Sequence, residues 1–313
     1  MKKVSILIPC YNAEGWIVDT IKSALAQTWY NKEIILVDDG SKDNTLNVAK
    51  QFAPRRVKII SQSNQGASAA RNRLLLEAQG DFIQYLDADD LLATDKIERQ
   101  AQLLSAGNAN CIAAGEWVRF YNSPTEAYFI PEPVWSDMSP VDWLICSWEG
   151  GGMMPLHAWL VPRQIAEKAG DWNEGLSLND DGEYFCRVVL ASRGIKFCPG
   201  AKSYYRSSIK GSLSGTNSRK ALESAIKSLE LCTNHLLVKE NSPRTRHACA
   251  TAFQRFIYST YPDAPDLIQM AEAKVQSLGG SDLKPSGGQC FQFLTHLGSW
   301  KLAKQLQKLS RRR

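Results

Sequence analysis

The sequence has no pair of cysteines at the C-x-x-C spacing, although eight cysteines are spread along its 313 residues. That spacing is typical of zinc sites and of thiol redox motifs, so neither kind of site is expected. Met1-Lys2-Lys3 runs into an apolar segment that is too short for the core of a signal peptide. We therefore expect a cytoplasmic protein with reduced thiols.

Long hydrophobic runs are also absent. No apolar run reaches about 18 residues, the length that a membrane-spanning helix needs. No internal repeat or low-complexity tract interrupts the chain. With 44% hydrophobic and 22% charged residues, the composition is that of a globular protein with a sizeable core. The length allows one large α/β domain with an appendage, or two modest domains.

The sequence has only a small excess of positive charge, with a formal net charge of +5. This value is too low to indicate nucleic-acid binding, and no nucleic-acid-binding motif is present. The basic residues gather at the C-terminus, as Lys301, Lys304, Lys308, Arg311, Arg312 and Arg313. Apolar residues between Phe291 and Leu309 would let this segment lie on the inner face of a membrane, or pack on its own domain with the lysines in solvent.

The first ninety residues alternate between apolar runs rich in β-formers and helical patterns. Such an alternation at roughly 25 to 30 residues per unit predicts an α/β fold with a mostly parallel sheet flanked by helices. The predicted strands are 4–9, 33–37, 57–60 and 82–86, and the predicted helices are 17–25, 43–52 and 69–78. From about Asn217 onward the pattern is helical only.

Polar segments follow three of the predicted strands. They are Pro9-Cys10-Tyr11-Asn12, Asp38-Asp39-Gly40-Ser41 and Asp87-Ala88-Asp89-Asp90. Because ligands bind beyond the carboxyl ends of strands in open parallel sheets, these segments are expected to meet in one cleft. Asp87 and Asp89 could share a hard divalent ion with phosphate oxygens. The alternative is an acidic turn in which Asp90 or Asp95 caps the next helix.

Two later features carry their own alternatives. Asp180-Asp181 opens a helical pattern, where acids are favoured by the helix dipole even without a catalytic role. The run Gly150-Gly151-Gly152 is either a mobile loop, a close approach to a ligand, or a plain connector. Trp148 and Trp159, on either side of it, could stack on a sugar but are expected to fill the core. His157 is interpreted as a structural histidine.

Four blocks, in this order and spacing, resemble family 2 glycosyltransferases. They are Val4-Ser5-Ile6-Leu7-Ile8-Pro9-Cys10-Tyr11-Asn12, Val37-Asp38-Asp39-Gly40-Ser41-x-Asp43, Asn64-Gln65-Gly66-x-x-x-Ala70-Arg71-Asn72 and Asp87-Ala88-Asp89-Asp90. The resemblance covers residues 1 to about 215 and implies a nucleotide-sugar-binding catalytic domain of the GT-A type. Residues 216–313 are not covered and are expected to form a helical C-terminal region.

The resemblance also implies a role for individual residues. Asp39 is expected to read the base of a nucleotide-diphospho-sugar, Asp87 to face the ribose, and Asp89 to hold Mn²⁺ or Mg²⁺ on the diphosphate. Asp181 would be the catalytic base, although many relatives have Glu where this chain has Asp180. The remaining expected donor-site residues are Pro9, Tyr11, Asn12, Gly66, Arg71, Ala88 and, through a looser likeness of Tyr205-Arg206 and Ser212-Leu213-Ser214, Arg206.

Together these expectations describe a metal-dependent inverting glycosyltransferase, a hexosyltransferase of cell-surface polysaccharide or glycolipid synthesis. The first choice of donor is a UDP-sugar, and the acceptor is a sugar or a lipid-linked sugar. A module that binds a nucleotide-sugar without turnover is the alternative, although it would not need Asp181. A phosphorelay receiver would be much shorter, and a dinucleotide-dependent dehydrogenase would need a Gly-rich turn after its first strand. The Q-x-x-R-W motif of processive relatives is absent, which argues against polymer synthesis.

Overall fold

The computed structural model describes residues 1–208, 218–288, 291, 294–295 and 299–310. The chain divides into two compact units, Met1–Thr216 and Asn217–Arg313, and the boundary predicted from the sequence was 215/216. The described cysteines are free thiols: Cys10, Cys111, Cys146, Cys186, Cys198, Cys232 and Cys249.

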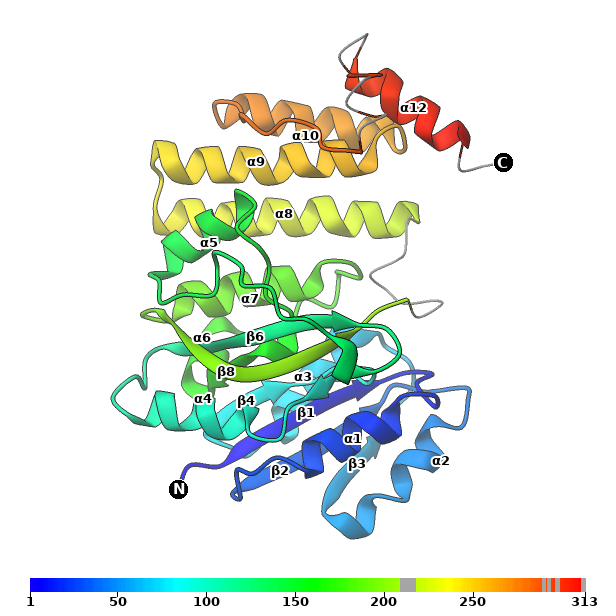
Figure 1. Cartoon of the computed structure of the whole chain (residues 1–313), viewed down its shortest axis with the longest axis vertical. Coiled ribbons are helices and arrows are strands. Elements are labelled where there is room, and N and C mark those ends of the chain that lie inside the picture. The colour runs from blue at the N-terminus through cyan, green and yellow to red at the C-terminus, as the bar shows by residue number, and fades with distance from the viewer. Residues whose placement is uncertain (209–217, 289–290, 292–293, 296–298, 311–313) are drawn as a thin grey trace. The chain divides into compact units, whose positions relative to one another are not determined.

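The first unit is built on a mixed eight-stranded sheet in the order β3-β2-β1-β4-β7-β6-β8-β5 (Figure 1). The pairs β1–β2, β1–β4, β2–β3 and β6–β8 are parallel, whereas β4–β7, β6–β7 and β5–β8 are antiparallel. The four N-terminal strands therefore form the predicted parallel sheet. The strands are β1 (Val4–Cys10), β2 (Lys32–Asp38), β3 (Val57–Ser61), β4 (Phe82–Tyr85), β5 (Leu91–Leu92), β6 (Ile112–Phe120), β7 (Trp159–Pro162) and β8 (Ile195–Arg206).

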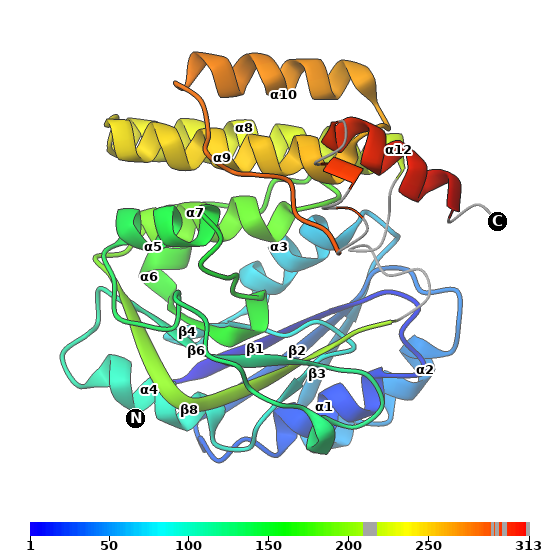
Figure 2. The ribbon, with the colours of Figure 1, turned by 45° about the horizontal axis from the view of Figure 1, so that its top comes forward.

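Helices cover both faces of this sheet. Figure 2 shows α1, α2 and α4 on one face and α3, α6 and α7 on the other. Every residue of β1 is buried, as expected for a central strand between two helical layers. The helices are α1 (Ile17–Leu25), α2 (Thr45–Lys50), α3 (Ala67–Glu77), α4 (Lys96–Ser105), α5 (Pro140–Trp148), α6 (Arg163–Ala169) and α7 (Asp180–Ala191), with short 3₁₀ turns η1 (Ala53–Arg55), η2 (Pro124–Glu126) and η3 (Leu156–Ala158).

The segment with the glycine run is closely packed. A Cβ on Gly152, which has φ +111°, would lie 2.5 Å from Glu132 Oε2, and one on Gly151 would lie 2.5 Å from Cys146 Sγ. Only glycine fits such approaches without a shift of its neighbours. The run therefore joins α5 to η3 through tight contacts with residues 132 and 146. Trp159, just beyond it, stacks on Phe185 in the core, as expected.

The second unit is helical in its described part, with α8 (Arg219–Lys239), α9 (Pro243–Thr260), α10 (Pro265–Ser277) and α12 (Trp300–Ser310). Its core includes Ile226, Phe253 and Leu267. Trp300 of α12 packs edge-on against Tyr258 and Tyr261, which ties the start of this helix to its own unit.

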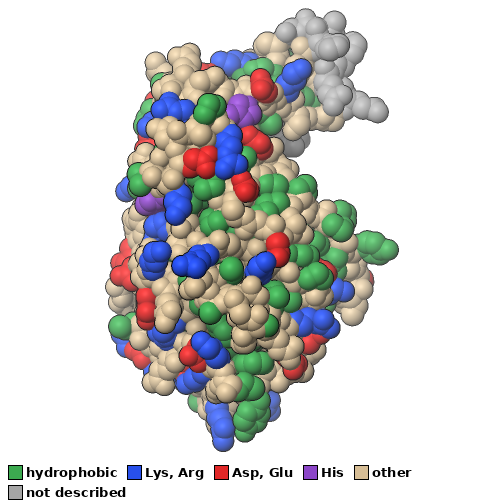
Figure 3. Space-filling view, turned by 90° about the vertical axis from the view of Figure 1, so that its left-hand side faces the viewer, with side chains coloured by type: hydrophobic (Ala, Val, Ile, Leu, Met, Phe, Trp, Pro, Cys, Tyr) green, Lys and Arg blue, Asp and Glu red, His purple; other side chains and the backbone are tan. Residues whose placement is uncertain are grey.

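The polar surface carries charges of both signs. Figure 3 shows Lys and Arg side chains interspersed with Asp and Glu on the face that it presents. Leu302 and Leu306 of α12 are exposed beside the lysines Lys301 and Lys304. The other parts of the basic, apolar C-terminal pattern, namely Phe293, Leu297, the side chain of Lys308 and Arg311 to Arg313, lie outside the described residues. None of the described helices has both the length and the apolar composition that crossing a membrane requires.

Candidate active site

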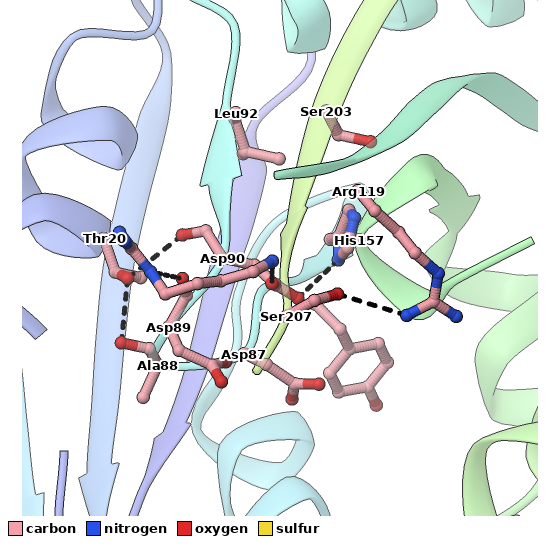
Figure 4. A network of polar contacts seen from close by, with 12 residues as sticks. Thr20, Asp87, Ala88, Asp89, Asp90, Leu92, Arg119, His157, Ser203 and Ser207 are labelled. Atoms are coloured by element: carbon pink, nitrogen blue, oxygen red, sulfur yellow. Dashed lines mark hydrogen bonds and ion pairs between the residues drawn. The ribbon is translucent and has the colours of Figure 1, made fainter. Parts of the chain in front are cut away.

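The acidic turn Asp87–Asp90 follows β4 and is held by two other elements (Figure 4). Thr20 Oγ1 of α1 donates hydrogen bonds to the carbonyls of Ala88, at 2.8 Å, and Asp90, at 3.0 Å. The backbone N–H of Arg206, at the end of β8, donates to Asp90 Oδ1 at 2.8 Å. The N–H of Asp90 donates to the carbonyl of Asp87 at 3.2 Å and closes the turn. The backbone of the turn is thus fixed from outside.

The side chain of Asp89 is half-buried in this turn. Burial, together with the carboxylates of Asp90 and Asp87, raises the pKa of Asp89 to about 8. The turn therefore holds more negative charge than the protein around it offsets.

Among the described residues, no three His, Cys, Asp or Glu side chains converge to hold a metal ion by themselves. Mg²⁺ in phosphate-transfer sites commonly takes one or two carboxylates and completes its shell with substrate phosphates and water, and Mn²⁺ favours the same oxygen ligands. A divalent cation on Asp89 would relieve the local excess of negative charge. The residues therefore fit a cation that arrives with a diphosphate.

Arg71 of α3 joins the acidic turn to the start of α7. Its Nη2 lies 3.0 Å from Asp87 Oδ1, and its Nη1 lies 2.8 Å from Asp180 Oδ2. The guanidinium sits over the ring of Trp172, with Cζ 4.5 Å from the ring centroid. Burial opposes the charge of this side chain, which is 6% exposed, but the two carboxylates raise the pKa of Arg71 above its ordinary value. The resemblance implies that Arg71 is a donor-site residue, and in the structure its side chain bridges Asp87 and Asp180.

Asp181 is the second residue of α7, and its side chain is half-buried. Its Oδ1 accepts a hydrogen bond from the N–H of Gly182 at 2.8 Å. Burial and the carboxylate of Asp180 raise the pKa of Asp181 to about 6, against the opposing effect of Arg71. A carboxylate with this pKa is ionised at neutral pH and is still a better proton acceptor than an ordinary aspartate. The arrangement suits a general base.

Asp39 follows β2 and is only 2% exposed. Its Oδ1 accepts hydrogen bonds from Gln62 Nε2, at 2.8 Å, and from the N–H of Gln65, at 2.9 Å, while its Oδ2 accepts from the N–H of Gly66 at 2.8 Å. An ionised carboxylate has about four acceptor positions, so these bonds leave room for about one more donor. Asp39 thus shapes the segment that leads into α3.

The other expected donor-site residues lie at the ends of β1 and β2. Tyr11 is 44% exposed, whereas Pro9 is buried opposite Val37 of β2. Asn12 adopts a left-handed conformation, with φ 49°, and its Oδ1 accepts a hydrogen bond from the N–H of Lys42 at 2.8 Å. Gly66, with φ +95°, has open space around its Cβ position. The loops after β1 and β2 therefore brace each other and leave Tyr11 facing solvent.

Arg206 is buried, and its guanidinium contacts protein groups rather than an open cleft. Its Cζ lies 4.7 Å from the centroid of the Trp16 ring and 4.5 Å from that of the Phe120 ring. Its Nε donates to the carbonyl of Asp89 at 2.9 Å. In the structure Arg206 therefore supports the acidic turn, and the associated Ser212-Leu213-Ser214 lies outside the described residues.

The sequence did not predict three contacts of the candidate site, which are made by Thr20, Ser68 and His157. Ser68 Oγ donates to Asp180 Oδ2 at 3.1 Å, and its place within the Gly66-to-Asn72 block was a usable signal. Thr20 and His157 lie outside the recognisable sequence blocks. Only the folded chain brings them to the turn.

Comparison with known proteins finds a match to a family profile and a shared fold. Residues 5–140 match the profile of the family described as "Glycosyl transferase family 2". The Escherichia coli protein named UDP-Glc:alpha-D-GlcNAc-diphosphoundecaprenol beta-1,3-glucosyltransferase WfgD is 35% identical over 132 residues, which is 42% of this chain and 52% of that protein. The chain spans between 18% and 52% of the length of the first curated relatives that it matches.

Solved structures resemble the chain over most of its length. S. aureus TarS 1–349 in complex with UDP-GlcNAc superposes with a TM-score of 0.72, covering 89% of this chain and 82% of that chain at 16% identity. The mannosyltransferase PcManGT from Pyrobaculum calidifontis, in complex with GDP-Man and Mn²⁺, has a TM-score of 0.54, covering 100% of this chain and 88% of that chain at 14% identity. At such identities the likeness establishes the fold, which is GT-A with additional C-terminal helices.

Proposed function

We propose that this protein, whose residues 5–140 match the glycosyl transferase family 2 profile, transfers a sugar from a nucleotide-diphospho-sugar to an acceptor hydroxyl with inversion at the anomeric carbon. The observation that carries the proposal is the pairing of Arg71 with both Asp87 and Asp180. This bridge holds a turn rich in carboxylates next to a separate acid, Asp181. In a direct displacement, the carboxylates of the turn would serve the donor. Asp181 would serve the acceptor as a general base.

The chemistry follows from the two acids. Asp181 would accept the proton of the acceptor hydroxyl as that oxygen attacks the anomeric carbon, and the nucleoside diphosphate would leave on the opposite face. A divalent cation on Asp89 would offset the charge that develops on the departing diphosphate. Arg71 keeps Asp87 and Asp180 in place throughout. A single displacement of this kind inverts the anomeric configuration.

The proposed donor is a UDP-sugar, with Mn²⁺ or Mg²⁺ as the cation. The name of WfgD specifies UDP-Glc, and the TarS and PcManGT complexes hold UDP-GlcNAc and GDP-Man with Mn²⁺ respectively. Asp39 would read the base, beside Pro9, Tyr11 and Asn12. The exposed ring of Tyr11 is suited to stacking on the base.

The proposed acceptor is a sugar or a lipid-linked sugar of cell-surface polysaccharide or glycolipid synthesis. A cavity of about 450 Å³ opens along the end of β6 and the following segment, lined in part by Trp117, Tyr121 and Tyr128. Arg119 also lines this cavity, which thus combines aromatic side chains with a polar group, as small-molecule pockets commonly do. The basic C-terminal segment is proposed to contact the inner face of a membrane, where lipid-linked acceptors are found.

The proposal is tested by incubating the protein with UDP-sugars and Mn²⁺, with water taking the place of the acceptor hydroxyl, and measuring the release of UDP. The configuration of the sugar product is read by NMR before the anomers equilibrate. An α-linked donor is expected to give a β product. Release of UDP with retention would refute the displacement mechanism, and tight binding with no turnover for any donor would favour a binding module.

A further inference from the structure

His157 of η3 is buried beside the acidic turn. It is 0% exposed, and its Nδ1 lies 2.8 Å from Oδ2 of Asp90, which is 1% exposed. The two atoms approach closely without the alignment of a hydrogen bond, and Nε2 of the ring has no partner among the described residues. Figure 4 shows the imidazole directed at Asp90 from the side opposite Thr20. The ring therefore acts on the turn through Nδ1.

The position of His157 is itself fixed. Its ring stacks on Tyr205, with the centroids 6.0 Å apart and the planes at 26°, and the guanidinium of Arg119 covers the Tyr205 ring at 4.9 Å. The carbonyl of His157 accepts a hydrogen bond from Gln84 Nε2 of β4 at 2.9 Å. Gln84 Oε1 in turn accepts a hydrogen bond from the buried Nζ of Lys96. The backbone of His157 is thus held by β4, and its ring by Tyr205 of β8.

The two carboxylate oxygens of Asp90 are held from two sides. The N–H of Arg206 binds Oδ1 at 2.8 Å, and His157 approaches Oδ2. Since the N–H of Asp90 also closes the turn on the carbonyl of Asp87, a rotation of Asp90 would move the backbone on which Asp89 stands. A buried carboxylate oxygen that lost its polar neighbour would be destabilised and would move.

We infer that His157 is a positioning residue for the cation that Asp89 would hold. It fixes Asp90, and through Asp90 the turn that aims the carboxylate of Asp89 toward the diphosphate. The inference rests on the proposed function, since it presumes that a divalent cation binds together with a nucleoside diphosphate. It assigns His157 a role in function that goes beyond filling the core.

The test measures the affinity of the full-length protein for Mn²⁺ in the presence of UDP, from the EPR signal of free Mn²⁺. The variants are His157→Leu, which removes the nitrogen beside Asp90, and His157→Asn, whose amide nitrogen can replace Nδ1. Leu104→Ala is the control, because Leu104 is a fully buried residue of α4 outside the acidic turn and its contacts. The melting temperature of each variant is recorded in parallel.

We expect His157→Leu to weaken Mn²⁺ binding about 10-fold or more, as the loss of supporting groups around a metal ligand commonly does. His157→Asn is expected to stay within about 3-fold of the wild type, and Leu104→Ala to lower the melting temperature without changing the affinity for Mn²⁺. If His157→Leu does not fold, His157→Gln replaces it, because its longer side chain displaces the amide from the Nδ1 position and should also weaken binding.

Two results would overturn the inference. One is a His157→Leu protein that binds Mn²⁺ as tightly as Leu104→Ala does. The other is equal weakening by His157→Leu and His157→Asn, which would mean that the nitrogen facing Asp90 is not what matters. Failure of the proposed function looks different, because the wild type itself would then bind no Mn²⁺ in the presence of UDP, and the inference would fall with it.

Discussion

Asp89 and Asp181 both have pKa values raised by burial and by neighbouring carboxylates, but the opposing charge differs between them. At Asp89 the causes are burial and two neighbouring carboxylates, Asp90 and Asp87. A bound cation would offset this negative charge. At Asp181 burial and one carboxylate, Asp180, are opposed by Arg71, and the pKa stays near 6. The surroundings of each side chain thus favour a cation ligand in one case and a proton acceptor in the other.

The proposed base can be removed with little change of shape. Asp181→Asn is expected to lower kcat by about 10²- to 10⁴-fold, because an amide cannot accept the proton of the acceptor. Binding of UDP, measured by calorimetry, should stay close to that of the wild type. Full transfer activity in a folded Asp181→Asn protein would show that another group is the base.

The pH dependence of the reaction should report the same carboxylate. Asp181 must be ionised to accept a proton, so with Mn²⁺ saturating, which keeps Asp89 ionised, kcat/KM is expected to fall about tenfold per pH unit below about pH 6 and to level off above it. The residual activity of Asp181→Asn should not show this fall of kcat/KM at low pH. A limb near pH 4 in the wild type would mean that the pKa of the essential acid is not raised.

At the scale of residues, the sequence predicted the side chains that lie inside its recognisable blocks. Asp39, Asp87 and Asp89 stand at strand ends, where the order of apolar runs and acids already placed them. Arg71 was also predicted, but its pairing with Asp180 depends on how α3 meets α7. His157 escaped because its contact with Asp90 exists only once β4, β7 and β8 pair.

At the scale of elements, the loop after β2 packs closely against the loop after β3 at Gly40. This glycine has φ +72°, and a Cβ there would lie 2.8 Å from the backbone nitrogen of Asn64. The contact holds the 62–66 segment, which Asp39 also binds, at the carboxyl edge of the sheet. The donor pocket therefore depends on a close approach of two loops.

Gly40→Ala is expected to destabilise the protein by about 1–3 kcal/mol, through backbone strain together with the clash at Asn64. Binding of UDP should weaken as well, because the loop that carries Gln65 and Gly66 must shift. Gly107→Ala is the matched control, since Gly107 has φ +98° but open space at its Cβ position. Thermal melts and UDP titrations of both variants make the comparison. Equal losses in the two variants would argue against the loop contact.

The elements that the sequence predicted well are those of the N-terminal half. Buried parallel strands are continuous apolar runs, so β1 to β4 were visible with errors of about one residue at their ends. The twelve residues of β8 lack both a continuous apolar run and a regular alternation, because the β6–β8 register shifts between Gly115 and Glu116. The four-residue β7 and two-residue β5 are too short to leave a pattern.

On the scale of the whole molecule, every predicted donor-site residue belongs to the first unit. The second unit has its own core of Ile226, Phe253 and Leu267. A protein of residues 1–216 alone is therefore expected to fold and to bind UDP with an affinity within about 3-fold of the full chain. Circular dichroism and calorimetry would check both points. A well-folded fragment without UDP binding would show that residues 217–313 contribute to the donor site.

The central claim, a nucleotide-sugar site that requires a cation on Asp89, is tested most directly by thermal denaturation with a set of nucleotide-sugars, with and without Mn²⁺. At about 100 times its dissociation constant, a bound donor should raise the melting temperature by about 5–10 °C. We predict such a shift for a UDP-sugar with Mn²⁺, and its loss in Asp89→Asn. No shift with any nucleotide-sugar, or an equal shift without Mn²⁺, would contradict the claim.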